Sequence, residues 1–449
     1  MFRGQKEYRG AQAIQEEDQS PQARTHRTVP GSSLAPRLPR RLAWLARLGE
    51  RIDRRWEESG YHPNRFTPIA AESLRADAWH EYFDEAEVIR WVGAAPRLPL
   101  QLDPQARFGE PPVTVWRTNR FVIDIYFWLH PDIAIHDHGF SGAFTNLRGD
   151  SLQCTYRFEE TGRVSAAARL GRLNPDSVTY LTPGTVQPII TARRFIHRVW
   201  HLGCPTVTLV IRTTRQPPRK GTLYFNSGLA LRPPETWPVA VDRRRRFVRY
   251  LFQRRHPGRW GLAEKMLRSA EPAAAFLYLS EIWQASPGLN DRGAVLLRRG
   301  SRPRSRKRAW MTRAIREMQA PDVMHSVNWE RLRRTEHRFL IALLSTYSYQ
   351  QPIADWVTPR YPGRAWQTTV TRWLREMVHD HAIDIELDSM HVAVLDGLMW
   401  DSSRRGVLRK LRSRYLLTKS DEQVLRRVMA RLPRSFLKPL LTADATIGG

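Results

Sequence analysis

Two histidines, His136 and His138, stand one residue apart in the largely apolar stretch FVIDIYFWLHPDIAIHDHGFSGAFTNLRG (121–149). The eight residues that open this stretch are nearly all apolar, and another short apolar run precedes Gly149. Side chains two positions apart on an extended strand point to the same face of a sheet. We therefore expect both imidazoles to enter the space that the sheet encloses, where they would form a pair of metal ligands.

A second β-rich stretch, residues 176–212, contains the expected third ligand. It holds a strand, a turn at Pro183 and Gly184, a strand that carries His197, and a β-branched strand. His201 lies four residues after His197, so on a regular strand it would share the same face. The residues alone leave both histidines open as the third ligand.

The hydrophobic pattern between 113 and 212 alternates with a period of two, which predicts strands. Turns with glycine, proline, asparagine or aspartate separate most of them. This pattern predicts an antiparallel β-barrel or jelly roll over 113–230. The expected strands are 113–117, 121–128, 143–148, 152–158, 163–170, 178–181, 195–201 and 206–212.

The chain has 449 residues, enough for more than one domain, and we expect a multidomain α+β protein. The barrel is followed by a mostly α-helical C-terminal domain, and helices also precede it. Before the barrel we expect a disordered tail at 1–38 and N-terminal helices within 39–112, at 40–58 and 73–91. After the barrel we expect a basic Pro/Arg-rich connector at 231–260, with RRRR at 243–246. A helical domain at 261–449 follows, with helices at 262–283 and within 392–441.

Three expected helices, at 329–347, 352–358 and 364–379, precede an alternating piece at 383–387. This order fits a winged-helix-like unit over 329–390, and it also fits a plain helical bundle. We favour the bundle because three-helix units recur in many folds that do not bind DNA. The sequence HDH at 379–381 ends a helix, where positions i and i+2 do not share a face, so we expect it to be solvated.

The formal net charge is +28, and arginine supplies most of it. A charge this large is typical of contact with nucleic acid, an anionic surface or an acidic partner. Arginines spread over a whole chain also follow from genome base composition, which is the reading we favour. Two cysteines, Cys154 and Cys204, make no disulfide framework. With no targeting segment and no apolar run of membrane-spanning length, we expect a soluble, cytoplasmic protein without membrane contact.

Four features together resemble the cupin signature. They are the HxH pair, a glycine eleven residues after its second histidine, the Pro-Gly turn and a lone histidine on a later strand. Within that superfamily, FVIDIYFWLHPDIAIHDHGFSG (121–142) and FIHRVW (195–200) resemble the cysteine dioxygenase-like thiol dioxygenases. The resemblance covers about residues 113–215. It implies a jelly-roll barrel with iron held by the HxH pair and by the histidine of the HRV-type segment.

This resemblance assigns His136, His138 and His197 as metal ligands and leaves His201 out. It implies Fe(II), although another divalent metal also suits three imidazoles, and it implies a small thiol or carboxylate substrate together with dioxygen. The family holds its substrate carboxylate with an arginine on an earlier strand, and Arg117 stands near that position, with Arg120 as the other candidate. A guanidinium suits this role because its donors match a carboxylate in pairs.

The chain departs from the family's pattern at several positions. Gly142 and Ala143 stand where cupins usually carry a glutamate, and Ala143 also takes the place of a thioether-forming cysteine. Val210 and Arg212 stand near the histidine and tyrosine of the assisting Ser-His-Tyr set. These departures put cysteine itself in doubt as the substrate, and Arg212 could instead hold an anionic group. An insertion at about 189–194 would reshape the cavity mouth.

Two classes of function follow. The first is a mononuclear non-haem iron dioxygenase that acts on a small thiol or related anion. The second is a non-catalytic metal- or ligand-binding cupin fused to a basic helical domain that binds a partner or nucleic acid. An enzyme needs open coordination sites beside an anion-holding arginine, whereas a regulator needs a contiguous basic face on its helices.

Overall fold

A computed structural model gives the fold of most of the chain, and residues 1–37 of the expected tail at 1–38 lie outside the residues that it describes. The described residues are 38–101, 109–130, 134–214, 221–232, 238–285, 306–319, 323, 326–383, 389–400, 403–415 and 417–442.

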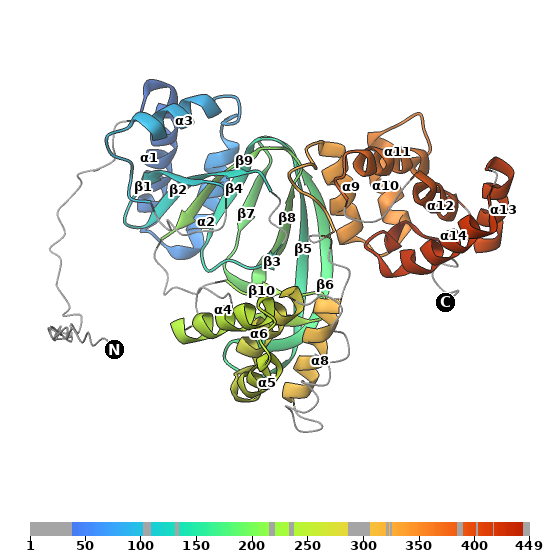
Figure 1. The fold of residues 1–449 in the computed structure, drawn as a ribbon. Helices are drawn as coiled ribbons and strands as arrows, with labels where there is room; N and C mark the ends of the chain where they lie inside the picture. The colour runs from blue at the N-terminus through green and yellow to red at the C-terminus, as the bar shows by residue number, and fades with distance from the viewer. Residues whose placement is uncertain are drawn as a thin grey trace, which may run out of the picture. The chain divides into compact units, whose positions relative to one another are not determined.

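The strands form a five-stranded antiparallel sheet and a closed barrel (Figure 1). In the sheet the order is β1 (Pro112–Arg117), β2 (Phe121–Trp128), β9 (Thr206–Thr213), β4 (Gly142–Arg148) and β7 (Val186–Ile189). In the barrel the order is β10 (Leu223–Tyr224), β11 (Leu229–Leu231), β6 (Ala168–Leu181), β5 (Ser151–Arg163), β8 (Ile196–His201) and β3 (Ile135–His136). Strand β10 pairs with β3 and closes the barrel, so the expected antiparallel barrel is confirmed, while its assignment as a jelly roll stays a prediction.

Strands β5 and β6 form one long hairpin where the sequence analysis placed a turn. The expected strands at 163–170 and 178–181 are therefore wrong at their ends, because residues 168–181 form a single strand. Pro175 lies opposite Tyr156 at a register shift, the kind of irregularity at which a strand accommodates proline. The turn lies instead between Arg163 and Ala168.

The N-terminal helices are α1 (Ala43–Glu58), preceded by the 3-10 turn η1 (Arg40–Leu42), α2 (Pro63–Arg75) and α3 (Glu85–Ala94). The expected helix at 73–91 is wrong, because Asp84 caps a new helix by accepting from the N–H groups of Ala86 and Glu87. Helix α2 packs on the sheet: its Phe66 ring lies 5.5 Å from Phe121. Helix α1 also contacts β1, and α2 contacts β4 and β7.

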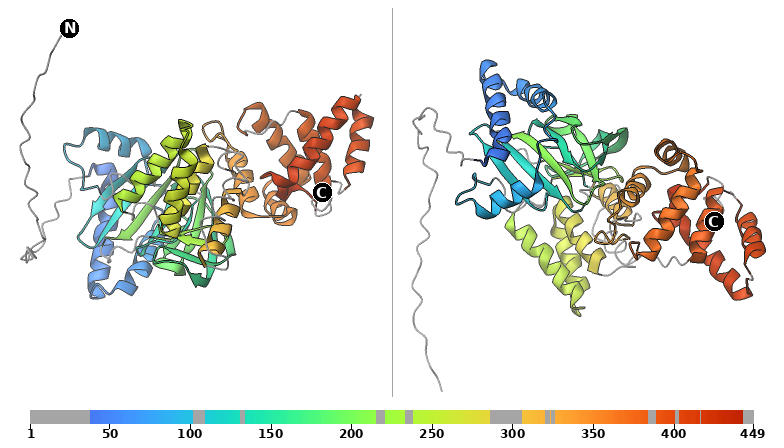
Figure 2. Two further views of the ribbon diagram at one scale, coloured as in Figure 1. Left: turned by 60° about the horizontal axis from the view of Figure 1, so that its bottom comes forward. Right: turned by 90° about the horizontal axis from the view of Figure 1, so that it is seen from above.

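Helices α4 (Val239–Gln253), α5 (Arg259–Ser269), α6 (Pro272–Ala285) and α8 (Arg306–Gln319) follow the barrel (Figure 2). The expected single helix at 262–283 is wrong, because Pro272 starts a new helix after residues 270 and 271. Much of the expected connector at 231–260 is helix α4. Buried Phe252, Phe276 and Trp310 from three of these helices belong to one apolar cluster with Leu229 of β11.

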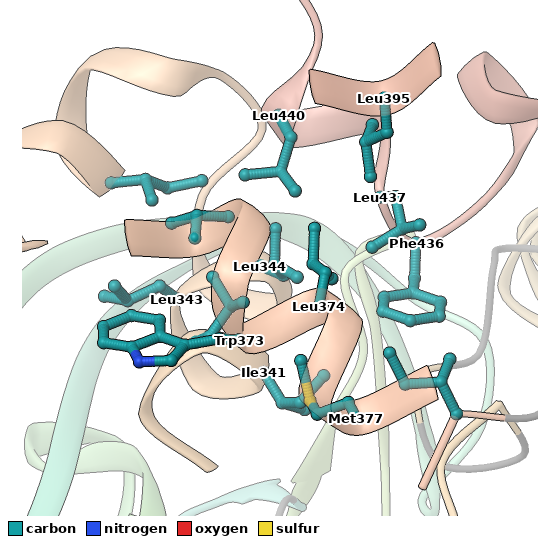
Figure 3. Close-up of a cluster of buried hydrophobic side chains, with 14 of the residues drawn as sticks. Ile341, Leu343, Leu344, Trp373, Leu374, Met377, Leu395, Phe436, Leu437 and Leu440 are labelled. Atoms are coloured by element: carbon teal, nitrogen blue, oxygen red, sulfur yellow. The ribbon is translucent and has the colours of Figure 1, made fainter. Parts of the chain in front are cut away.

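The C-terminal region contains α9 (Thr335–Thr346), α10 (Gln350–Arg360), α11 (Trp366–His379), α12 (Ser389–Trp400), α13 (Arg404–Arg414) and α14 (Lys419–Arg431), and the 3-10 turns η4 (Leu432–Arg434) and η5 (Lys438–Leu440). Apolar side chains from these elements meet in one core, part of which Figure 3 shows. That core continues into the barrel through Leu152 and Trp200. The expected helical C-terminal region is thereby confirmed.

Ile383 forms an isolated antiparallel bridge with Val327, and the rest of the alternating piece, 384–388, lies outside the described residues. The winged-helix alternative therefore stays a prediction. At the end of α11, the side chain of His379 is 90% exposed, as expected for the solvated HDH sequence. None of the helices within the described ranges is both long enough and apolar enough to cross a membrane.

Candidate metal centre

His136, His138 and His197 lie together at one end of the barrel. His136 belongs to β3 and pairs in register with His197 on β8. One nitrogen from each ring lies within 4.8 Å of the others, a group able to hold a metal ion. The three ring centroids are 4.7 to 4.9 Å apart. The structure thus brings together the three histidines that the sequence analysis selected.

Strand β3 contains only Ile135 and His136, so His138 lies beyond the regular strand. Hydrogen bonds from three residues hold this segment in place. Asp137 points away from the histidines, where its carboxylate accepts from the Thr222 N–H and the Tyr224 hydroxyl, each at 2.7 Å. The His138 carbonyl accepts from the N–H of Ala192, which lies 54 residues later in the sequence, at 2.8 Å.

Ala192 belongs to η2 (Ala192–Arg194), inside the insertion that the sequence analysis placed before the third ligand. The same insertion contributes the Thr191 hydroxyl, which lies 2.6 Å from the Ser141 hydroxyl. The insertion thus supports the loop that carries His138, a role with no local signal in the sequence.

Two of the three imidazoles are oriented through their outer ring nitrogen. His197 Nδ1 lies 3.2 Å from Gln153 Oε1, and His136 Nδ1 lies 2.9 Å from the Ala134 carbonyl. An oxygen acceptor at Nδ1 places the proton there and leaves the Nε2 lone pair for a ligand. His138 Nε2 and His197 Nε2 lie 2.8 Å apart, so the two nitrogens are close enough to bind the same ion.

Burial lowers the pKa of His138 and of His197 well below the usual range, and the neighbouring His136 lowers both further. Both imidazoles are therefore neutral near pH 7, the form that binds a metal ion. Convergent nitrogens, oriented rings and neutral protonation states together fit a divalent metal held by three histidines.

His201 is excluded from this group, although the residues alone left it open. Its ring stacks on Trp128 with centroids 4.3 Å apart, and its Nδ1 lies 3.1 Å from the Ser151 hydroxyl. Burial lowers the pKa of His201 to about 3. It is a neutral core histidine.

Aromatic rings form the wall beside the histidines. The centroid of Phe140 lies 4.6 Å from His138, and that of Phe195 lies 4.5 Å from His197. Phe144 lies 6.2 Å from His197 on another side. Apolar rings at these positions lower the polarity beside two of the three histidines, which strengthens electrostatic interactions at the site.

Arg212 lies beside this wall, with its guanidinium carbon 5.5 Å from the centroid of Phe140. Its Nε donates to Asp124 at 2.7 Å, and the Asp124 side chain is only 2% exposed. The Thr114 hydroxyl donates to the other Asp124 oxygen at 2.7 Å. The Tyr126 hydroxyl donates to Asp124 at 3.4 Å. The arginine therefore belongs to a buried polar cluster on the adjacent strands.

Arg117 lies at the end of the edge strand β1, where its guanidinium donates to the Leu100 carbonyl at 3.3 Å. The neighbouring candidate Arg120 lies over the Tyr61 ring at 3.7 Å. Neither of these two contacts involves the three histidines. Of the arginines considered from the sequence, Arg212 is the one whose contacts reach the wall of the site.

Gly142 stands where cupins usually carry a glutamate, and the packing explains the small residue. A Cβ at this position would lie 1.8 Å from the Ile211 carbonyl oxygen of the adjacent strand β9. The close approach of β4 and β9 leaves no room for any side chain at this position. A fourth, carboxylate ligand at Gly142 is thereby excluded by geometry.

Asp124 and Gln153 were missed by the sequence analysis. Asp124 had a signal, because it is the lone charged residue in the apolar strand FVIDIYFW. Gln153 had none, since a glutamine in a strand is ordinary and its partner His197 lies 44 residues away.

No family model matches the chain, and no curated protein matches it. Among solved structures, one similar chain comes from crystal structures of DMSP lyases, with 14% sequence identity, 40% of this chain and 97% of that chain covered, and a TM-score of 0.22. A TM-score this low carries no argument about fold or function. The closed barrel and its histidine triad by themselves fit a cupin with a metal site.

Proposed function

We propose that this chain is a mononuclear non-haem iron dioxygenase of the cysteine dioxygenase-like kind, acting on a small thiol or a related anion. The observation that carries the proposal is the convergence of three imidazoles, two of whose outer nitrogens are already bonded to oxygen acceptors. Three nitrogen ligands leave other positions of a six-coordinate ion open. Fe(II), when bound there, would supply the redox chemistry that a reaction with dioxygen requires.

The chain's own residues would bind and shield the substrate. Phe140, Phe144 and Phe195 would exclude water, and Arg212 would hold an anionic group. Asp124 occupies the Nε of Arg212, so the donors proposed for a substrate are those on the terminal nitrogens. Because Asp124 already balances the guanidinium charge, the anion would bind more weakly than at an unpaired arginine.

The same ion pair favours a second candidate function. A guanidinium bonded to a buried carboxylate has less capacity to recruit an anion, which suits a non-catalytic metal-binding cupin. In that case the basic helices would carry the function. Oxygen consumption separates the two candidates.

The first test is metal content by elemental analysis of protein purified without oxygen. We expect about one iron per chain in the wild type, loss of the metal in His138→Ala, and retention in His379→Ala, which removes an exposed histidine. Oxygen uptake is then measured with a panel of thiols. Bound iron without oxygen uptake would support the non-catalytic function, and absence of metal from the wild type would contradict both.

A second measurement tests the arginines. We expect Arg212→Gln to raise the KM for an anionic thiol by about tenfold or more, because it removes a charged hydrogen bond to the substrate. Arg117→Gln serves as the matched control at the edge strand. A larger effect from Arg117→Gln would move the anion-holding role to that residue.

A further inference from the structure

Helix α4 carries a face that neither the metal centre nor the core uses. Val248, Leu251 and Phe252 turn inward and are buried. On the opposite side, Val239, Phe247 and Tyr250 are exposed by 72, 61 and 54%. Exposed apolar side chains gathered on one helix face mark a surface for interaction.

Arginines alternate with these apolar side chains along the same face. Positions 243, 247, 250 and 254 follow one another at intervals of four, three and four residues, which brings them to one side of a helix. The sequence there reads RRRRFVRYLFQR from 243 to 254. We define the α4 face as Val239, Arg243, Arg246, Phe247, Tyr250 and Arg254.

Acidic partners lie to the sides of this face and leave part of its charge unbalanced. Asp242 accepts from Arg246 at 2.8 Å, and Glu281 of α6 pairs with Arg245 at 3.2 Å. Arg243 and Arg254 are exposed and have no ion pair among the residues that the structure describes. The face thus offers free guanidinium groups beside aromatic rings.

The two rings stand together. The centroids of Phe247 and Tyr250 lie 5.9 Å apart with their planes inclined by 51°. Rings that are fixed on a helix and bordered by arginines can stack with bases while the guanidinium groups meet phosphates. A membrane-surface helix usually separates its basic and apolar residues onto different faces, which is not the arrangement on α4.

We propose that the α4 face (Figures 1 and 2) binds single-stranded nucleic acid, with Phe247 and Tyr250 stacking on bases and Arg243 and Arg254 contacting the phosphates. Charge complementarity supports this partner: the chain carries a formal net charge of +28, and α4 carries five arginines against the single carboxylate of Asp242. The proposal is independent of the reaction at the metal centre.

The test uses the full chain and a fluorescein-labelled single-stranded 20-mer of uridines, followed by fluorescence anisotropy. We expect Phe247→Ala with Tyr250→Ala to weaken binding by about tenfold or more, because stacking on an aromatic side chain contributes substantially for each base. We expect Arg243→Gln with Arg254→Gln to lower the dependence of log affinity on log salt by about 1.4, for two lost phosphate contacts.

Matched controls lie in the N-terminal region of the chain. Arg54→Gln with Arg65→Gln removes two exposed charges, and Tyr82→Ala removes an exposed ring. Thermal melts followed by circular dichroism establish that each variant folds. Loss of affinity confined to the α4 variants supports the proposal.

Three results would overturn it. The first is wild-type affinity in the α4 ring variant, and the second is an equal loss in the N-terminal controls, which would indicate diffuse charge. The third is binding to phosphatidylserine vesicles that depends on Phe247 and Tyr250 while the oligonucleotide does not bind. That last outcome would assign the face to a membrane surface.

Discussion

At the residue scale, Gln153 shows how a neutral side chain orients one of the three grouped histidines. Its Oε1 lies 3.2 Å from His197 Nδ1, and its amide nitrogen donates to Gln187 Oε1 at 3.1 Å. The second contact fixes which end of the amide faces the histidine. We expect Gln153→Leu to weaken metal binding by about 10- to 100-fold, as loss of an orienting partner commonly does.

The measurement is a competition titration with Co(II) or Zn(II) against a chromophoric chelator. Gln351→Leu, an exposed position on α10, is the control and should bind as the wild type does. Unchanged affinity in Gln153→Leu would mean that the histidine rings are held by packing alone.

His201 makes a separate prediction about acid stability. Its pKa is about 3 in the folded protein, against an ordinary value of 6.5, because it is buried. Below pH 6.5 the imidazole of His201 is protonated in the unfolded chain but stays neutral in the folded protein. The free energy of unfolding therefore decreases as the pH falls from 6.5 toward 3. We expect His201→Asn to lose less stability over this interval than the wild type does.

Urea unfolding at several pH values measures this difference. His379→Asn should follow the wild type, because that histidine is exposed at the end of α11. Parallel pH dependence in the wild type and in His201→Asn would show that His201 takes up a proton in the folded state.

The three histidines that the structure brings together were predicted because the HxH pair is a local signal and the family resemblance selected His197 over His201. The sequence did not predict the residues that hold His138, His197 and Arg212 in place. Gln153, Asp124 and Ala192 act across the sheet through contacts whose partners lie 44, 88 and 54 residues away. Spacing along the chain carries no information about such contacts.

At the scale of elements, strands β4 and β9 approach so closely that Gly142 has no room for a methyl group. A Cβ there would meet backbone, which cannot rotate away as a side chain can. We expect Gly142→Ala to destabilise the protein by about 3 kcal/mol, toward the upper end for overpacked sites. Gly162, where a Cβ meets nothing within 4 Å, provides the matched control.

Thermal unfolding of the two variants measures this difference in stability. Gly162→Ala should melt within a few degrees of the wild type, and Gly142→Ala should melt well below it. A mild effect at Gly142 would mean that β4 and β9 separate at little cost, and the explanation for the missing glutamate would fail.

Element boundaries were predicted least well where turn-forming residues occur inside regular structure. The run GRLNPDS at 171–177 contains glycine, asparagine, proline and aspartate, yet it lies within β6 because pairing with β5 tolerates a shift at Pro175. Pro272 had the opposite effect, since it divided an expected helix in two. Tertiary pairing decides between these outcomes, and a single sequence does not reveal it.

At the scale of the whole described chain, one arginine connects the helical region to the barrel. Arg338 of α9 is 2% exposed, and burial lowers the pKa of its guanidinium. It donates to the carbonyls of Leu332, Gly203 and Leu129, at 2.6, 2.8 and 2.8 Å. The last two carbonyls belong to loops of the β-sheet region, so these bonds join residues 135 and 209 positions apart in the sequence.

The apolar core reinforces this connection, because barrel residues such as Leu152 and Trp200 share a cluster with Phe339 of α9. A continuous core with a central, fully bonded guanidinium should make the barrel and the helices unfold together. We expect a single transition in differential scanning calorimetry of the wild type.

Arg338→Met tests that expectation. The change leaves three carbonyl groups without their donor, and hydrogen bonds to a charged group contribute about 1.5 to 3 kcal/mol each, partly offset here by removal of a buried charge. We expect a net loss of about 3 kcal/mol and a split into two transitions, with the helical region melting first. Arg333→Met, which removes an exposed guanidinium bonded to the Glu330 carbonyl, should leave one transition. If Arg338→Met also melts in one step, the shared apolar core alone couples the two regions, and the arginine only adds stability to a unit that is already continuous.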